Sequence, residues 1–308
     1  MRILHIEDAA GVGFILAKYQ QRQGHESKVI KYIDHDKYGI VNFYRDYCLS
    51  VKAEEFAKAC AREAEAADII HIHSVITTLF MLRKKFGRSK KIILHYHGTD
   101  IRRAFGYKEQ GLKLLSSIRM SNLLNSFPNL RKAVSGIADF AVSTKQAHFL
   151  AQRLADSVLV STPDLLEMVP NAIYLPNPVD TDHFRPVSFS IDRQKDALIM
   201  VTEAIDIRPG LDHCRNHNIS LEIEVYDRTK SPIMYSQMPD FLRSYKVYVD
   251  IRYVNQRILA NLSKTALESL ASGLTVLDYQ LKSIQKLPDE HLPVNVVSQL
   301  EHLYIDIK

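Results

Sequence analysis

The sequence predicts an α/β protein made of two doubly wound domains, in which helices cover both faces of a mainly parallel sheet. Its 308 residues and hydrophobic content of 46% suffice for two domains of ordinary size. Short apolar strands alternate with helices, beginning with a strand–turn–helix–strand series at residues 2–32. A proline-punctuated segment at residues 172–186 indicates a linker after the first such series.

The expected elements follow the apolar runs in order. In the first series we expect strands at residues 2–6, 28–32, 68–74, 91–100, 138–143 and 157–161, helices at about 14–23, 53–67 and 145–155, and a loop at 34–47. In the second series we expect strands at residues 197–202, 221–226, 247–251 and 274–277, and helices after Ser263 and at 281–286 and 294–307.

The composition limits the partners and the compartment. A net charge of +5 suits an anionic substrate or an anionic membrane surface but is too small to indicate nucleic acid. Cys48, Cys60 and Cys214 lack metal-ligand or disulfide spacing, which indicates a reducing compartment. No signal-peptide core follows Met1 and no apolar run could span a bilayer, so we expect a cytoplasmic protein, with a peripheral position on the inner membrane face left open.

A uniformly basic stretch at residues 83–91 bears on that membrane alternative. It is either a solvated helix end or an interfacial patch for anionic lipid headgroups. Its cations are Arg83, Lys84, Lys85, Arg88, Lys90 and Lys91.

The glycines after the first strand form a tight turn. Gly11 and Gly13 match part of a dinucleotide fingerprint, but Leu16 occupies the place of the third glycine, so nicotinamide binding is weakly indicated. Backbone N–H groups of such a loop can approach a phosphate.

Two histidine pairs, His71 with His73 and His95 with His97, lie at strand ends, where ligands bind in doubly wound sheets. Such pairs also suit a metal, but no accompanying Asp and Lys set completes a metal site, and core histidines bonded to backbone explain some of them.

The stretch at residues 263–278 predicts a helix followed at once by a strand. Ser263 is a suitable N-cap and Gly273 suits the left-handed residue that ends a helix. Lys264 adds a cation where backbone N–H groups already favour phosphate. Glu268 lies within the apolar part of this helix and is either a solvated helix residue or a functional carboxylate.

This stretch resembles the donor-binding helix of GT-B glycosyltransferases of the large retaining family 4. Glu268 and residues 270–276 match the second half of its acidic motif, whereas the first acidic position falls on Ala260. Residues 16–26, the segments D-I-I-H-x-H and H-x-H-G-T-D, and above all residues 176–186 match further family patterns, which leaves Asp180-x-Asp182 as an incidental metal motif. The resemblance implies two Rossmann-like domains facing a central cleft, at residues 1–187 and 188–308, with the last helix packing back on the first domain.

The resemblance also implies an activity, which is transfer of a sugar from a nucleoside-diphosphate sugar to an acceptor. The family acts with retention at the anomeric carbon and needs neither metal nor cofactor. It places the catalytic residues His97, Asp100 and Gly13 at the transferred sugar. The donor-binding residues are Arg208, Ser263, Lys264, Thr265 and Glu268, with Glu268 on the ribose and the others on the diphosphate. The sequence does not give the sugar, the base or the acceptor; a lipid-linked molecule and a glycan are the candidate acceptors, and no nucleic acid is expected.

The departures from the family keep other functions open. The two family cations that hold the diphosphate fall on Ala204 and Pro209, and Arg208 is the nearest substitute. A nucleotide-sugar-binding protein with weak or no activity, a nucleotide-sugar epimerase and a metal hydrolase built on the histidines are therefore alternatives.

Overall fold

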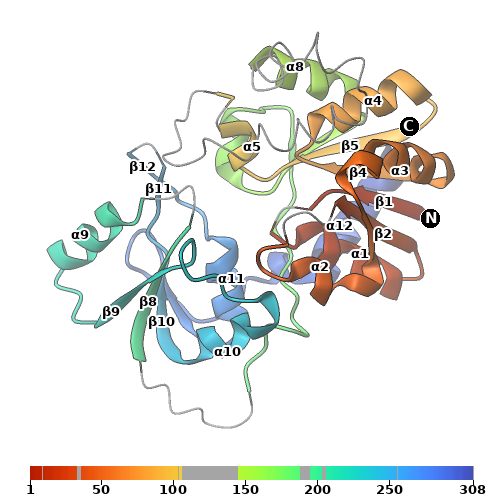
Figure 1. Ribbon diagram of the computed structural model, residues 1–308. Helices are drawn as coiled ribbons and strands as arrows, with labels where there is room; N and C mark the ends of the chain where they lie inside the picture. Colours follow the sequence, from red (N-terminus) through yellow and green to blue (C-terminus); the bar gives the residue numbers. More distant parts are fainter. Residues whose placement is uncertain are drawn as a thin grey trace.

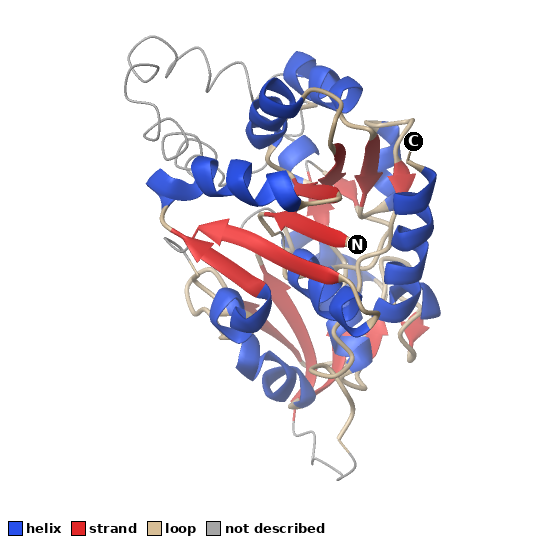
Figure 2. Cartoon of the chain, turned by 90° about the vertical axis from the view of Figure 1, so that its right-hand side faces the viewer, coloured by secondary structure: helices blue, strands red, loops and turns tan. Residues whose placement is uncertain are grey.

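The computed structural model describes residues 1–8, 10–32, 36–102, 104–105, 145–187, 195–202, 206–254 and 256–307. These residues form two α/β halves, one built on the strands up to residue 174 and the other on the strands from residue 195 (Figure 1). Helices flank the strands in both halves (Figure 2). The doubly wound α/β architecture is therefore confirmed.

The first half contains a seven-stranded sheet in the order β3-β2-β1-β4-β5-β6-β7, and every neighbouring pair is parallel. The strands are β1 (Arg2–Ile6), β2 (Glu26–Tyr32), β3 (Cys48–Val51), β4 (Ile69–His73), β5 (Lys91–Tyr96), β6 (Ser157–Val160) and β7 (Ile173–Tyr174). The strand order reverses between β1 and β4, so the carboxyl ends of these two strands border the switch point where doubly wound sheets bind ligands.

Both faces of this sheet are covered. Along β1, Ile3 belongs to one hydrophobic core and Leu4 and Ile6 belong to the other, as alternation along a strand requires. The described helices of this half are α1 (Val12–Arg22), α2 (Ile40–Phe43), α3 (Ala53–Ala66), α4 (Ile76–Phe86), α5 (Thr99–Arg102) and α8 (Lys145–Leu154), with 3-10 turns η1 (Arg45–Tyr47) and η2 (Pro163–Glu167).

The second half contains a five-stranded sheet in the order β14-β13-β10-β8-β9, parallel except for β14. Its strands are β8 (Lys195–Val201), β9 (Ile223–Asp227), β10 (Tyr245–Val249), β13 (Thr275–Leu277) and β14 (Ser283–Ile284), and a separate ribbon pairs β11 (Tyr253–Val254) with β12 (Arg257–Ile258). Its helical segments are α9 (Arg208–Asn216), η3 (Tyr235–Gln237), α10 (Met238–Arg243), α11 (Lys264–Ala271) and η4 (Asp289–His291).

The last helix, α12 (Pro293–Asp306), returns to the first half and lies beside α1 (Figure 1). Tyr304 accepts a hydrogen bond from Gln20 of α1 at 3.3 Å, and Glu301 pairs with His25 at 2.6 Å. The linker is fixed to α1 as well, because the buried carboxylate of Asp180 accepts two bonds from Lys18 at 2.7 and 2.8 Å. Contacts from the linker and from α12 therefore fasten both ends of the second half to α1.

Two expectations were wrong, and aspartates explain both. The expected loop at residues 34–47 contains α2 and η1, because the Asp36 carboxylate accepts from the N–H groups of Ile40 and Asn42 and so starts a helical turn. The expected helix at residues 281–286 is the strand β14, because Asp278 accepts from the N–H groups of Gln280 and Lys282 and closes a tight turn.

The other expected helices and strands within the described residues lie within a few residues of their expected bounds, whereas β3, α9, α10, β11 and β12 were not expected. The expected strand at residues 138–143 lies outside the described residues. Within the described part, no helix is both long and apolar enough to cross a bilayer.

Candidate active site

The loop between β1 and α1 is held by one carboxylate. Asp8 is buried and accepts from the N–H groups of Gly11 and Gly13 at 2.9 and 2.7 Å. Glu7 and Ala10 have left-handed backbones, with φ of 63° and 54°, and such strain often marks functional sites. The expectation that this loop offers its N–H groups to a phosphate is wrong for both glycines, because Asp8 already occupies them.

Gly13 lies where the loop passes directly over β4. A Cβ atom there would stand 3.2 Å from Nε2 of His73 and 3.3 Å from the Asp8 carboxylate. A larger residue would therefore push the loop away from the histidines. The predicted site residue Gly13 is thus placed beside the strand ends, as a close-approach glycine.

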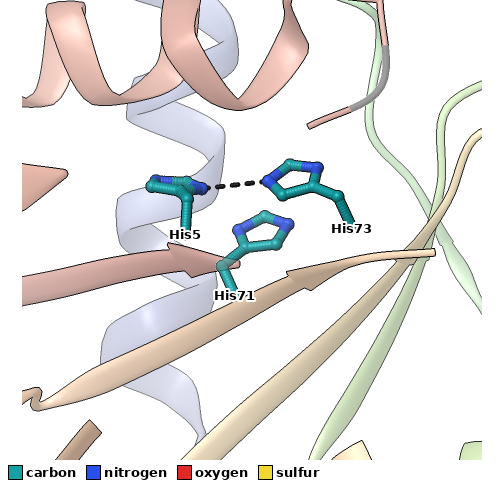
Figure 3. A group of neighbouring side chains, drawn as sticks. All are labelled: His5, His71 and His73. Carbon is teal, nitrogen blue, oxygen red and sulfur yellow. Dashed lines mark hydrogen bonds between the residues drawn. The ribbon is translucent and has the colours of Figure 1, made fainter. Parts of the chain in front are cut away.

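Five histidines, rather than the four noted in the sequence, gather on one face of the first sheet. His5 of β1 joins His71 and His73 of β4, which it faces across the strand pair (Figure 3). His73 is bonded to His5 at 3.0 Å and to His97 at 2.9 Å. Burial lowers the pKa of all four of the rings just named, His5, His71, His73 and His97, so these rings are neutral at pH 7.

Two overlapping groups of histidines offer metal-ligating atoms within 4.8 Å of one another, one formed by His5, His71 and His73 and the other by His73, His95 and His97. Neutral imidazole suits zinc, copper, iron or nickel. In both groups, however, ring nitrogens already bond to one another, and an ion would have to replace those bonds. The Asp180-x-Asp182 pair is likewise engaged, since both carboxylates pair with Lys18.

Asp100 shapes the backbone around His97. Its carboxylate accepts from the N–H groups of His97, Gly98 and Ile101 at 2.7–3.1 Å. The His97 ring is only partly buried; desolvation lowers its pKa, and the charges of Asp100 and Asp8 oppose that shift. The structure therefore brings the predicted residues Gly13, His97 and Asp100 to one region, joined through His73 and the loop.

The N-terminus of α11 has the predicted cap. The Ser263 side chain accepts from the N–H of Ala266 at 2.9 Å, and the Ser263 N–H itself donates to Asp250 at 2.7 Å. The Ser263 N–H is therefore not free for a ligand. Lys264 and Thr265 are the first helical residues, whose N–H groups have no partner within a helix.

Lys264 and Glu268 form a largely buried pair on α11, in which the side chains are 13% and 6% exposed. Their charged atoms are 3.9 Å apart, and Lys264 also donates to the backbone carbonyl of Pro178 in the linker. Burial lowers the pKa of Lys264 and raises the pKa of Glu268, while the charge of each partner opposes the shift of the other. The charges of Asp8 and Asp180 also act on Lys264, so this helix end faces the glycine loop and the linker.

Arg208 differs from Lys264 and Glu268 in being exposed. It is the first residue of α9, its side chain is 76% exposed, and it pairs with Asp206 at 3.1 Å. To meet a diphosphate it would have to leave Asp206. Pro209 is the next residue of the same helix, and Ala204 lies outside the described residues.

Two side chains that the sequence did not single out also approach Glu268. Arg228 directly follows β9, its guanidinium lies 4.1 Å from the centre of the Tyr38 ring, and its charge opposes the upward pKa shift of Glu268. Tyr235 is buried between the halves and bonds to the Tyr44 hydroxyl at 3.0 Å. A lone arginine at the carboxyl end of a predicted strand was the available signal for Arg228.

The basic stretch at residues 83–91 is largely engaged within the protein. Arg83 is buried and donates to the Asp156 carboxylate, and Arg88 pairs with the same group at 2.9 Å. Lys85 pairs with Glu65, and Lys90 donates to backbone carbonyls. The structure thus gives the expected membrane contact no support.

Comparison with known proteins identifies the fold of this chain. No protein-family model matches the sequence, and no curated protein matches it. Solved structures do match in fold, among them two complexes of an alpha-glucosyltransferase. One is an alpha-glucosyltransferase in complex with UDP and a 13-mer DNA containing an A:G mismatch, at 12% identity and a TM-score of 0.51, covering 99% of this chain and 91% of that one.

The other is an alpha-glucosyltransferase in complex with UDP-glucose and DNA containing an abasic site, at 12% identity and a TM-score of 0.50, covering 99% of this chain and 90% of that one. Both matches extend over nearly the whole of each chain, so they involve both halves. The chain therefore has the GT-B fold, as the resemblance of its motifs implied.

Proposed function

We propose that this protein is a glycosyltransferase that takes a sugar from a nucleoside-diphosphate donor. The observation that carries the proposal is the buried pair of Lys264 and Glu268 at the start of α11, which faces the Asp8–Gly13 loop and the linker. A buried ammonium beside free helical N–H groups suits a diphosphate, and a buried carboxylate beside it suits ribose hydroxyls. The GT-B fold supports this assignment by analogy with other proteins of the same fold.

In this proposal the donor diphosphate lies against Lys264 and the N–H groups of Lys264 and Thr265, with Ser263 as the cap that shapes them. The leaving diphosphate gains charge in the transition state, so cations held in place stabilise that state more than the ground state. Arg208 is the further cation proposed from the sequence, and Arg228 is the one that the structure adds. Neither a metal nor a cofactor is needed for this chemistry.

The transferred sugar lies at Gly13 and His97, with Asp100 behind His97. We propose retention at the anomeric carbon and a lipid-linked or glycan acceptor. DNA accompanies both similar structures, so it is the acceptor against which this proposal is tested. The isolated thiols Cys48, Cys60 and Cys214 support a cytoplasmic setting.

A nucleotide panel tests the proposal directly. A ligand that binds only the folded protein raises its melting temperature, so UDP, GDP, ADP, CDP and TDP are compared at equal concentration. The sugar nucleotides of any stabilising base are then tested for cleavage, and the products are examined by mass and NMR. Stabilisation together with donor cleavage supports the transferase. No stabilisation by any nucleotide contradicts it.

Other outcomes identify the alternatives. Tight nucleotide binding with no cleavage of any donor favours a binding protein, and conversion of one sugar nucleotide to its epimer favours an epimerase. A hydrolytic activity that depends on a bound metal favours the hydrolase.

A further inference from the structure

A continuous row of hydrogen bonds leads from α1 to the end of β5. The side-chain amide oxygen (Oε1) of Gln20 lies 2.8 Å from Nε2 of His5. Nδ1 of His5 lies 3.0 Å from Nε2 of His73, and Nδ1 of His73 lies 2.9 Å from Nε2 of His97. Gln20, His5 and His73 are almost completely buried, whereas His97 is only partly so. Figure 3 shows the central link, in which His5 and His73 point toward each other. The row therefore connects the buried amide of Gln20 to His97, the partly buried end of the histidine cluster.

A neutral imidazole has one N–H donor and one bare acceptor nitrogen, so each ring in such a row fixes the next. The Gln20 oxygen only accepts, so the proton of His5 is on Nε2 and its Nδ1 is bare. His73 must then donate from Nε2, which leaves its Nδ1 bare, and His97 must donate from Nε2. The bare nitrogen of His97 is consequently Nδ1.

With the amide in this orientation, the other two contacts of Gln20 are also satisfied. Ser27 donates its hydroxyl proton to the same oxygen at 2.7 Å, and the amide nitrogen donates to the Tyr304 hydroxyl at 3.3 Å. A second row starts there, because Tyr304 can then donate to Nδ1 of His71 at 3.0 Å, and His71 to Nδ1 of His95 at 3.1 Å. With this orientation of the Gln20 amide, one set of proton positions therefore satisfies the bonds between all five rings.

The second row ends on an unpaired atom. Nε2 of His95 has no hydrogen-bond partner among the described residues, although the ring is buried. The rings of His95 and His97 are 4.2 Å apart between centres. The two rows therefore end close together, one at His95 of β5 with an N–H donor and the other at His97, just after β5, with a bare acceptor.

We propose that Gln20 is a positioning residue that fixes the tautomer of His97, so that His97 presents Nδ1 as an acceptor to a hydroxyl of the bound sugar. The assignment of the tautomer stands on the hydrogen bonds alone, whereas its use in sugar transfer rests on the proposed function. Gln20, His5 and His73 act through His97 and need not touch the substrate.

The test is histidine ¹⁵N NMR of the full chain, in which bare and protonated ring nitrogens give well-separated signals. Wild-type His97, identified by the loss of its signals in His97→Gln, should show a protonated Nε2 and a bare Nδ1. Gln20→Leu removes the acceptor, so the row should shift toward the reversed arrangement, which leaves a bare nitrogen rather than an N–H without a partner. Gln20→Glu retains an acceptor oxygen and should retain the His97 tautomer. Gln23→Met, on the exposed end of the same helix, should change nothing.

A protonated Nδ1 on His97 in the wild-type protein overturns the proposal, and this result does not depend on whether any variant folds. An unchanged tautomer in folded Gln20→Leu overturns it as well. With a donor identified, Gln20→Leu should lower kcat by up to about tenfold, the size expected for the loss of one hydrogen bond, while the nucleotide Kd stays unchanged. The predicted NMR signals with no transfer from any donor would contradict the proposed function and leave the tautomer assignment standing.

Discussion

Replacing Glu268 separates a ligand-binding carboxylate from a structural one. The side chain is only 5% exposed, and its nearest cation, Lys264, is 3.9 Å away, which is too long for a hydrogen bond. The cost of removing this carboxylate from water is only partly offset by nearby positive charge, so the ionised side chain destabilises the folded protein, and its pKa is raised. We therefore expect Glu268→Gln to fold normally and to be at least as stable as the wild type.

The expected loss is in donor binding. Hydrogen bonds to a charged group contribute about 1.5–3 kcal/mol each, so two ribose hydroxyls lost in Glu268→Ala correspond to about 3–6 kcal/mol at most. Since 1.4 kcal/mol is tenfold, the Kd should rise by about 10²–10⁴-fold. Glu268→Gln keeps one acceptor oxygen without the charge and should lose less. Isothermal titration with the nucleoside diphosphate measures both, and Glu290→Gln on the surface is the control.

The pH dependence of the unfolding free energy is a second test of Glu268. The pKa of Glu268 is raised in the folded protein, so its favourable contribution is complete below the unfolded value of about 4.3 and is lost as pH rises through the higher folded value. The unfolding free energy of Glu268→Gln should therefore fall less than that of the wild type between pH 4 and pH 7. An unchanged Kd in Glu268→Ala, together with a large loss of stability, would refute the reasoning and make Glu268 structural.

Three further predictions concern the other charges. Donor cleavage should survive a chelator, because the diphosphate site is built from cations and a helix end; loss of turnover that added divalent metal restores would contradict this. The rate of single-turnover donor cleavage should fall about 10²–10³-fold when the cation that contacts the diphosphate is removed. We expect a larger loss for Arg228→Ala than for Arg208→Ala, because the Arg208 side chain is paired with Asp206 and exposed. If both variants cleave the donor at the wild-type rate, neither arginine takes part in the mechanism. Asp180→Asn should cost about 3–5 kcal/mol of unfolding free energy, because it removes the charge of a fully buried carboxylate that accepts from Lys18 and from the Tyr44 hydroxyl, although Lys18 keeps its pair with Asp182. Asp182→Asn, whose carboxylate is 46% exposed, should cost under about 1 kcal/mol; similar losses in chemical denaturation would show that the linker does not depend on Asp180.

Much of the fold followed from apolar patterns, because burial dictates them. The helix α11 shows this best, since the cap at Ser263 and the left-handed Gly273, with φ of 83°, both lie where the sequence placed them. The misplaced segments share a cause that periodicity does not reveal. Asp36 and Asp278 bond to nearby backbone N–H groups, and those bonds decided between helix, loop and hairpin.

The histidine cluster was only half predictable for a different reason. The alternation within β4 and β5 put each histidine pair on one face, but no local pattern tells which strands are neighbours. His5 joined the cluster because β1 pairs with β4 in register, with His5 opposite His71. Gln20 was out of reach as well, since its role depends on how α1 packs over the sheet and on α12 returning from the far end of the chain.

The charges at the junction of the halves bear on whether a transferase or a binding protein is the better description. Asp8 and Asp250 accept from N–H groups at two places where a phosphate could otherwise bind, so the first turn of α11 is the anion site that we propose. Lys18 is already paired with Asp180. Lys264 lies 3.9 Å from Glu268, and the charges of Lys264 and Arg228 both oppose the upward shift of the Glu268 pKa. Binding a diphosphate requires only that these cations outweigh the nearby carboxylates in the ground state. Transfer requires more, namely a cation placed where the leaving oxygen gains charge, and this is why the chemical step, rather than nucleotide affinity, decides between the two.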